Sequence, residues 1–112
     1  MNKRLILGAL FAAFLPLLAQ AETWKGAPVV DRMCYERAKT DPDAHTTKCA
    51  LACVKSGYGI ISADGTFLKL DDAGNEKLAK LLKDTKKKDH LRVTVDGKRQ
   101  GDSITVNSVS LD

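Results

Sequence analysis

The C-terminal stretch "LRVTVDGKRQGDSITVNSVSLD" (91–112) constrains the fold of this chain most strongly. Apolar residues alternate with polar ones on both sides of a turn at "DGKRQGD", which is the pattern of two strands that each bury one face: first Leu91, Val93 and Val95, then Ile104 and Val106. Val109 and Leu111 fall on the opposite parity from Ile104 and Val106. This slip of one residue predicts a β-bulge near Asn107-Ser108, and bulges allow a short sheet to curl.

Three shorter strands are predicted upstream of this hairpin. "WKGAPVVD" (24–31) has a β-rich end after a proline, which predicts a first strand. In "YGIISADGTFLKL" (58–70), two apolar runs flank Asp64-Gly65, the dipeptide that best fits a tight primed turn. We therefore expect a second hairpin here.

A helix is expected between the first and second strands. Asp41-Pro42-Asp43 provides an N-cap, a proline at the first helical position and an acid in the first turn. Such a helix would run to about Ser56, with Gly57 as its left-handed C-cap. Alternatively, Thr46 or Thr47 is the N-cap, which leaves His45 outside the helix.

A second helix is expected in "AGNEKLAKLLKDT" (73–85). Asp71 or Asp72 can cap it, and its leucines form an apolar stripe at helical spacing: Leu78, Leu81 and Leu82. Gly74 weakens the first turn.

The order of these elements predicts a mainly β fold with two helices. Strand, helical insertion, strand, strand, helix, strand, strand is the plan of a small five-stranded Greek-key barrel of the OB type, with a helix between strands 3 and 4. Closing the barrel removes the exposed edges that five short strands would otherwise leave. The alternative is an open antiparallel sheet with one helix packed on a face.

The N-terminal segment has the features of a cleaved signal peptide. Lys3 and Arg4 precede an apolar run over 5–18, and Ala19-Gln20-Ala21 supplies the small residues of a cleavage site. The run is shorter than the roughly 20 residues of a membrane-spanning helix. We therefore expect a signal peptide over 1–21 and a single exported domain over 22–112, periplasmic or secreted, with no membrane span.

The charge balance argues against a nucleic-acid partner. The chain has 18 basic and 14 acidic residues, and two of the basic ones, Lys3 and Arg4, belong to the predicted signal peptide. The remaining domain is only slightly basic, which favours solubility over binding to phosphate backbones.

The segments "GAPVVDRMCY", "CALACVKSGYGIISADGTFLKLD" and "LRVTVDGKRQGDSITVNSVSLD" together resemble the small exported bacterial OB-fold domains, whose members are mostly uncharacterised. The resemblance covers nearly all of the predicted mature chain in element order. It implies a pattern of one cysteine after the first strand, a histidine and two cysteines on a helix, which falls here on Cys34, His45, Cys49 and Cys53. It implies no activity.

These four residues also form a candidate metal site on their own chemistry. On a helix that starts at Pro42, His45, Cys49 and Cys53 would share one face, and the barrel could bring Cys34 against it. Three thiolates and one imidazole suit zinc or copper(I).

A structural disulfide is the competing interpretation. The 3 cysteines lie in a chain predicted to be exported, where disulfides persist, and the odd number leaves one thiol over. Cys34 could pair with Cys49 or Cys53, whereas a Cys49–Cys53 bridge does not fit the geometry of a regular helix.

No catalytic constellation is present in the sequence, so we predict a protein that is not an enzyme. The preferred hypothesis is an exported OB-fold binding module stapled by a disulfide through Cys34, whose partner is a protein or an oligosaccharide. Tyr58 and Trp24 are its candidate ligand surface. The alternative is a small metal-binding protein that uses the four residues directly.

Overall fold

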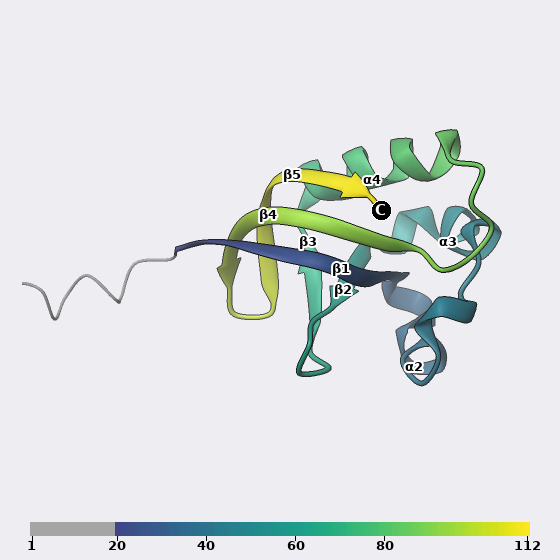
Figure 1. Cartoon of the computed structure of the whole chain (residues 1–112), viewed down its shortest axis with the longest axis horizontal. Coiled ribbons are helices and arrows are strands. Elements are labelled where there is room, and N and C mark those ends of the chain that lie inside the picture. Colours follow the sequence, from purple (N-terminus) through teal and green to yellow (C-terminus); the bar gives the residue numbers. More distant parts are fainter. Residues whose placement is uncertain (1–19) are drawn as a thin grey trace, which may run out of the picture.

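The computed structural model describes residues 20–112, so the predicted signal peptide lies almost wholly outside the described residues. Five strands close into a barrel in the order β1-β2-β3-β5-β4 (Figure 1): β1 (Ala21–Asp31), β2 (Tyr58–Ile61), β3 (Phe67–Leu70), β4 (Arg92–Gln100) and β5 (Ser103–Leu111). Neighbouring strands are antiparallel except β3 and β5, which are parallel. The prediction of a five-stranded OB-like barrel is confirmed, and the open-sheet alternative is wrong.

The β4–β5 hairpin contains the predicted bulge. Asp96 pairs with Ser108 and Gly97 pairs with Val106, so Asn107 is the extra residue on β5. The strands are longer than the alternation suggested, because β4 continues to Gln100 and only Gly101 and Asp102 make the turn. The predicted turn over 96–102 is therefore too long.

The β2–β3 hairpin is confirmed, but its turn differs from the predicted one. The loop spans five residues (62–66), and Gly65 is its residue with a left-handed φ, 86°. Its N–H donates to the Ser62 carbonyl at 2.9 Å. The carboxylate of Asp64 accepts from the Ser62 hydroxyl and from the Thr66 N–H. A primed turn would need a positive φ at Asp64 as well.

Helix α4 (Asp72–Asp84) lies between β3 and β4, as predicted, and buries Leu78 and Leu82 against the barrel. Asp71 is the N-cap and accepts from the Gly74 N–H at 2.9 Å. A Cβ at Gly74 would stand 2.5 Å from Cγ2 of Val106. Glycine at this position therefore lets the first turn of α4 approach β5 closely.

The segment between β1 and β2 (residues 32–57), which we call the insertion, consists of short helical turns. They are η2 (Arg32–Cys34), α2 (Tyr35–Ala38), η3 (Pro42–Ala44), α3 (Thr47–Ala52) and η4 (Val54–Ser56). In Figure 1 the labelled turns α2 and α3 lie at one end of the barrel.

The prediction of one helix from Pro42 to Ser56 is wrong. Pro42 starts only the single turn η3, and His45 has an extended backbone (φ −69°, ψ 124°). Thr46 caps α3 by accepting the Cys49 N–H, which is the alternative start suggested by the sequence. Gly57, with φ 83°, ends the segment as expected. Capping by the threonine side chain outweighed continuation of the helix through His45.

Polar contacts hold the insertion against the start of β4 and against the segment that joins α4 to β4. The guanidinium of Arg92 donates twice to the Asp43 carboxylate, at 3.1 and 3.0 Å. The Thr47 N–H and hydroxyl donate to the carbonyls of Lys88 and Lys87. These contacts fix the second half of the insertion relative to the barrel.

Candidate functional site

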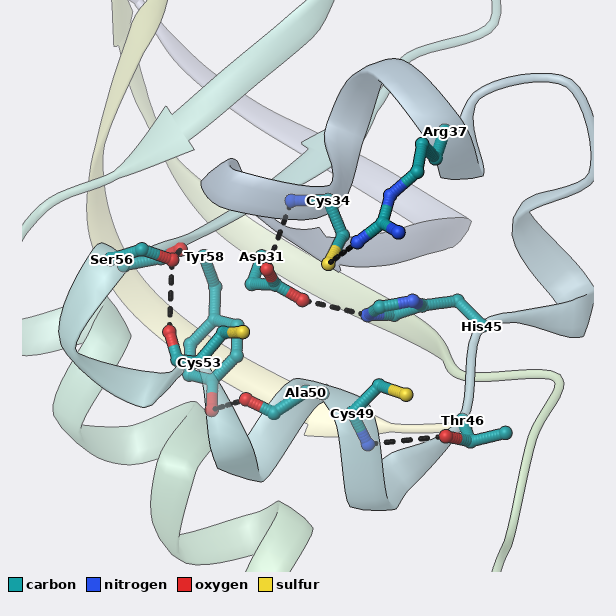
Figure 2. Close-up of polar contacts among 11 residues, drawn as sticks. Asp31, Cys34, Arg37, His45, Thr46, Cys49, Ala50, Cys53, Ser56 and Tyr58 are labelled. Atoms are coloured by element: carbon teal, nitrogen blue, oxygen red, sulfur yellow. Dashed lines mark hydrogen bonds and ion pairs between the residues drawn. The ribbon is translucent and has the colours of Figure 1, made fainter.

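The site is organised by Asp31, the last residue of β1, whose side chain is fully buried. Oδ2 accepts from the Cys34 N–H at 3.1 Å, which caps η2. Oδ1 lies 2.7 Å from Nε2 of His45 (Figure 2). A buried carboxylate is costly unless it is paired and hydrogen-bonded, and the imidazole and the amide meet this need.

Two thiols join this carboxylate. Cys34 stands at the end of η2 and Cys53 at the end of α3, and both are half-buried. An oxygen of Asp31, Sγ of Cys34 and Sγ of Cys53 all lie within 4.8 Å of one another. Donors this close from three different elements can converge on one ion, and we call these three residues the donor cluster.

The thiol of Cys53 lies in surroundings that disfavour negative charge. Burial raises the pKa of the Cys53 thiol above its ordinary value, and the Asp31 carboxylate and Cys34 raise it further. Burial also raises the pKa of Tyr58 to about 12, with added contributions from Asp31 and Cys53. Without a cation the Cys53 sulfur therefore keeps its proton at neutral pH, and a bound cation would displace that proton.

A surface hollow opens beside the donor cluster. Its lining includes Cys34, Arg37, His45 and Cys49, with Ala38, Asp41 and Ala44 completing the wall. Nη2 of Arg37 donates to Sγ of Cys34 at 3.6 Å. Figure 2 shows Arg37, Cys34 and His45 grouped on one side of this region and Cys49 on α3 opposite. The guanidinium of Arg37 is therefore the cationic group that contacts the donor cluster from the side of the hollow.

The structure brings together part of the predicted set of four. Cys34 and Cys53 belong to the donor cluster, and His45 contacts it through Asp31. Cys49 is exposed and lies outside the cluster, although it shares the hollow with Cys34 and His45. The predicted stripe of His45, Cys49 and Cys53 on one helix face is wrong, because α3 begins only after His45.

Asp31 is the residue that the sequence analysis missed. An aspartate that ends an apolar strand and precedes a helical turn is a capping signal, and it was available in "VVDRMC". The ring of His45 is buried and contacts the Asp31 carboxylate.

The three cysteines are free thiols in the structure. The sulfur atoms of Cys34 and Cys53, one of the two predicted pairs, lie within 4.8 Å of each other. The disulfide itself stays a prediction.

The predicted ligand surface is wrong for Tyr58. This side chain is fully buried, and its hydroxyl donates to the Ala50 carbonyl at 2.9 Å, because β2 turns it into the core beneath α3. Trp24 is partly exposed. It lines a separate hollow between β1 and the β2–β3 turn, together with Lys25, Ser62 and Arg92.

Comparison of the chain with protein-family models, curated proteins and solved structures returns no match. The interpretation of the site therefore depends on its own geometry. Within residues 20–112, no helix is both long enough and apolar enough to cross a membrane.

Proposed function

We propose that this protein binds a metal ion, and that the ion is Zn²⁺ held by Asp31, Cys34 and Cys53. One observation carries the proposal: a carboxylate oxygen and two cysteine sulfurs, from the end of β1, from η2 and from the end of α3, lie within 4.8 Å of one another. A carboxylate and two thiolates are ordinary zinc ligands.

The mixed donors favour zinc over copper(I). Copper(I) is a soft ion that selects thiolate and thioether ligands, whereas a carboxylate is a hard oxygen donor. Zinc is borderline and accepts both. The buried carboxylate and two thiolates also bring a surplus of negative charge, which a divalent ion compensates better than a monovalent one. The guanidinium of Arg37, whose Nη2 lies 3.6 Å from Sγ of Cys34, offsets part of the negative charge that remains.

His45 is assigned as a positioning residue. Its Nε2 lies 2.7 Å from Oδ1 of Asp31, so the imidazole orients the carboxylate toward the two sulfurs. Partners of this kind fix the geometry of a ligand, and their loss typically weakens metal affinity about 10- to 100-fold. The three donors leave a fourth position for water or for a ligand that arrives from the hollow.

Cobalt(II) substitution tests this assignment, because thiolate-bound cobalt gives charge-transfer and d–d absorption bands. Cys34→Ser and Cys53→Ser are each expected to weaken binding and to reduce the thiolate band. Cys49→Ser is the matched control, since it removes an exposed cysteine of the same region and is expected to keep both bands and the affinity. Equal loss in all three variants would instead support the three-cysteine set with His45. No cobalt or zinc binding by the reduced protein would overturn the proposal.

The wider setting of the site is proposed from the sequence. We infer that the protein is exported, with cleavage after Ala21, and that it is not an enzyme; the signal-like segment and the lack of a catalytic motif support this. Intact mass of the protein from the exported fraction tests the export and the cleavage. A chain that starts at Glu22 is expected, and a full-length chain in that fraction would contradict it.

The second candidate is the binding module stapled by a disulfide. The closeness of the Cys34 and Cys53 sulfurs favours it, and a cross-link of this kind is typically worth about 2–4 kcal/mol. The half-exposed Trp24 would then offer the contact for a protein or an oligosaccharide. Denaturation of the exported protein in the presence of a chelator, followed by alkylation without reductant, separates the two candidates, because zinc-bound thiols are then freed and disulfide-bonded ones are not. One reactive thiol would support the staple, and three would exclude it.

A further inference from the structure

The three cysteines differ in solvent exposure. Cys49 is exposed, Cys34 and Cys53 are half-buried, and Asp31 is fully buried. Cys49 also lines the hollow that contains Cys34 and His45. We propose that Cys49 is the sulfur through which the ion enters and leaves the donor cluster. This inference rests on the zinc site proposed above.

The hollow connects the exposed sulfur of Cys49 with the donor cluster. The hollow touches the donor cluster through Cys34, and Asp41, His45, Arg37 and two alanines complete its wall. Of the groups that an ion in the hollow can meet, two are sulfurs: the exposed one of Cys49 and the half-buried one of Cys34, which belongs to the cluster. The Thr46 hydroxyl accepts the Cys49 N–H at 3.1 Å, which fixes the backbone of Cys49 in the first turn of α3.

Transfer by way of Cys49 proceeds through ligand exchange without a change of oxidation state. The Cys49 thiol loses its proton and forms a bond to zinc. At the same time one sulfur–zinc bond of the incoming zinc–thiolate complex breaks, and the departing thiolate takes up a proton. Cys34, Cys53 and Asp31 then bind the ion, and the two thiols release their protons. The remaining bonds between zinc and the thiolates of its carrier break as those thiolates take up protons, and the Cys49–zinc bond breaks as that sulfur is protonated again. Each step keeps zinc ligated, which avoids the cost of a bare ion.

The hollow is lined by one cation, Arg37, and one carboxylate, Asp41, and it is the cation that stands beside Cys34 and indicates the chemical class of the zinc carrier. Arg37 is exposed at its wall, with Nη2 3.6 Å from Sγ of Cys34. A guanidinium attracts anionic groups, and zinc that is carried by thiolates forms anionic complexes. The geometry points to zinc carried by an anionic thiolate, rather than the free aqua ion, as the form in which the metal is received.

The test compares the rate of zinc uptake with the affinity for zinc. Zinc is presented to the reduced full domain as its glutathione complex, uptake is followed by stopped flow, and affinity is measured separately by competition with a chromophoric chelator. Cys49→Ser is expected to slow uptake about tenfold, equivalent to about 1.4 kcal/mol of activation free energy, while the affinity stays within about twofold. Lys48→Ser, an exposed neighbour on α3 that does not line the hollow, is the matched control and is expected to keep both values.

Arg37→Ala sharpens the assignment of the donor. It is expected to slow uptake from the glutathione complex more than uptake from the aqua ion, because only the former is anionic. Equal slowing for both forms would overturn the donor class.

The measurements distinguish failure of the entry role from failure of the zinc site itself. If Cys49→Ser takes up zinc as fast as Lys48→Ser does, the entry role is wrong while the zinc site stands. If Cys49→Ser lowers the affinity as much as Cys34→Ser does, Cys49 is a resident ligand and the inference is overturned. If the wild-type chain binds no zinc, the proposed function itself fails.

Discussion

The barrel and the insertion are built by different means. The barrel buries a continuous apolar core that is drawn from all five strands and α4. The insertion contributes little apolar surface, and Ala38 and Ala50 are its small, well-buried side chains. Polar contacts hold it instead: Asp31 with His45 and Cys34, Arg92 with Asp43, and Thr47 with the carbonyls that follow α4.

This difference explains where the chemistry lies. An apolar barrel core has no place for unpaired polar groups, whereas a segment of short capped turns presents side chains at its many ends. Cys34 and Cys53 both stand at such ends, and Asp31 stands where the barrel strand passes into the insertion. The barrel therefore supplies rigidity, and the insertion supplies the donors.

The barrel is expected to respond as one unit to a cavity. Leu78→Ala removes a fully buried side chain of α4 and should lower the free energy of unfolding by about 2–5 kcal/mol. Leu81→Ala, on the same helix but only half-buried, is the control and should cost less. Chemical denaturation followed at probes on different barrel strands should show a single transition, and separate transitions within the barrel would contradict its description as one unit.

The insertion is expected to respond locally to loss of its central carboxylate. Asp31→Ala leaves the His45 ring and the Cys34 N–H without their acceptor, at a cost of about 1–3 kcal/mol. Hydrogen exchange should speed up over residues 32–57, while the amides of β4 and β5 keep their protection. Uniform loss of protection over the whole chain would show that the two regions are not separable. Zinc affinity should fall in the same variant.

The contact between α4 and β5 can be tested at Gly74. In most helices glycine to alanine is stabilising, but here the new Cβ would stand 2.5 Å from Cγ2 of Val106. Gly74→Ala is therefore expected to destabilise the barrel by about 1 kcal/mol or more through overpacking. A thermal melt measures the effect. Stabilisation by the substitution would contradict the close packing described above.

The smallest effect is expected at the β2–β3 turn, which lies outside both regions. Hydrogen bonds from Ser62 and Thr66 lower the pKa of Asp64 from 3.8 to about 2. Because the folded-state pKa is depressed, the stabilisation by this carboxylate is present above pH 3.8 and is lost as the pH falls from 3.8 toward 2. A titration of the Asp64 carboxyl by NMR checks this pKa. A midpoint near pH 3.8 would show that the hydrogen bonds of the turn do not stabilise the carboxylate.

The sequence was sufficient for the barrel because its signals are local. Alternation, the slip at Asn107 and the dipeptide Asp64-Gly65 each depend on neighbouring residues. The lengths of β4 and β5 were missed because Gly97 and Gln100 look like turn residues, and only their pairing with β5 makes them strand. Gly74 likewise looked like a weakness in a helix until Val106 was placed against it.

The site was harder to predict because it depends on contacts between distant segments. Spacing identified Cys34 and Cys53 as candidates, but not that the last residue of β1 would stand between them. Helical periodicity grouped His45 with Cys49 and Cys53, and one threonine cap removed that grouping. Tyr58, between two glycines, was expected in a ligand-binding loop of the barrel, but it belongs to β2 and is buried.

X-ray absorption at the zinc edge of the reduced, zinc-loaded protein tests the central claim most directly. Two sulfurs at about 2.3 Å, accompanied by oxygen or nitrogen donors at about 2.0–2.2 Å, are the predicted shell. A shell with three sulfurs would place Cys49 among the resident ligands, and a shell without sulfur would show that Cys34 and Cys53 do not bind the ion; either result would contradict the account.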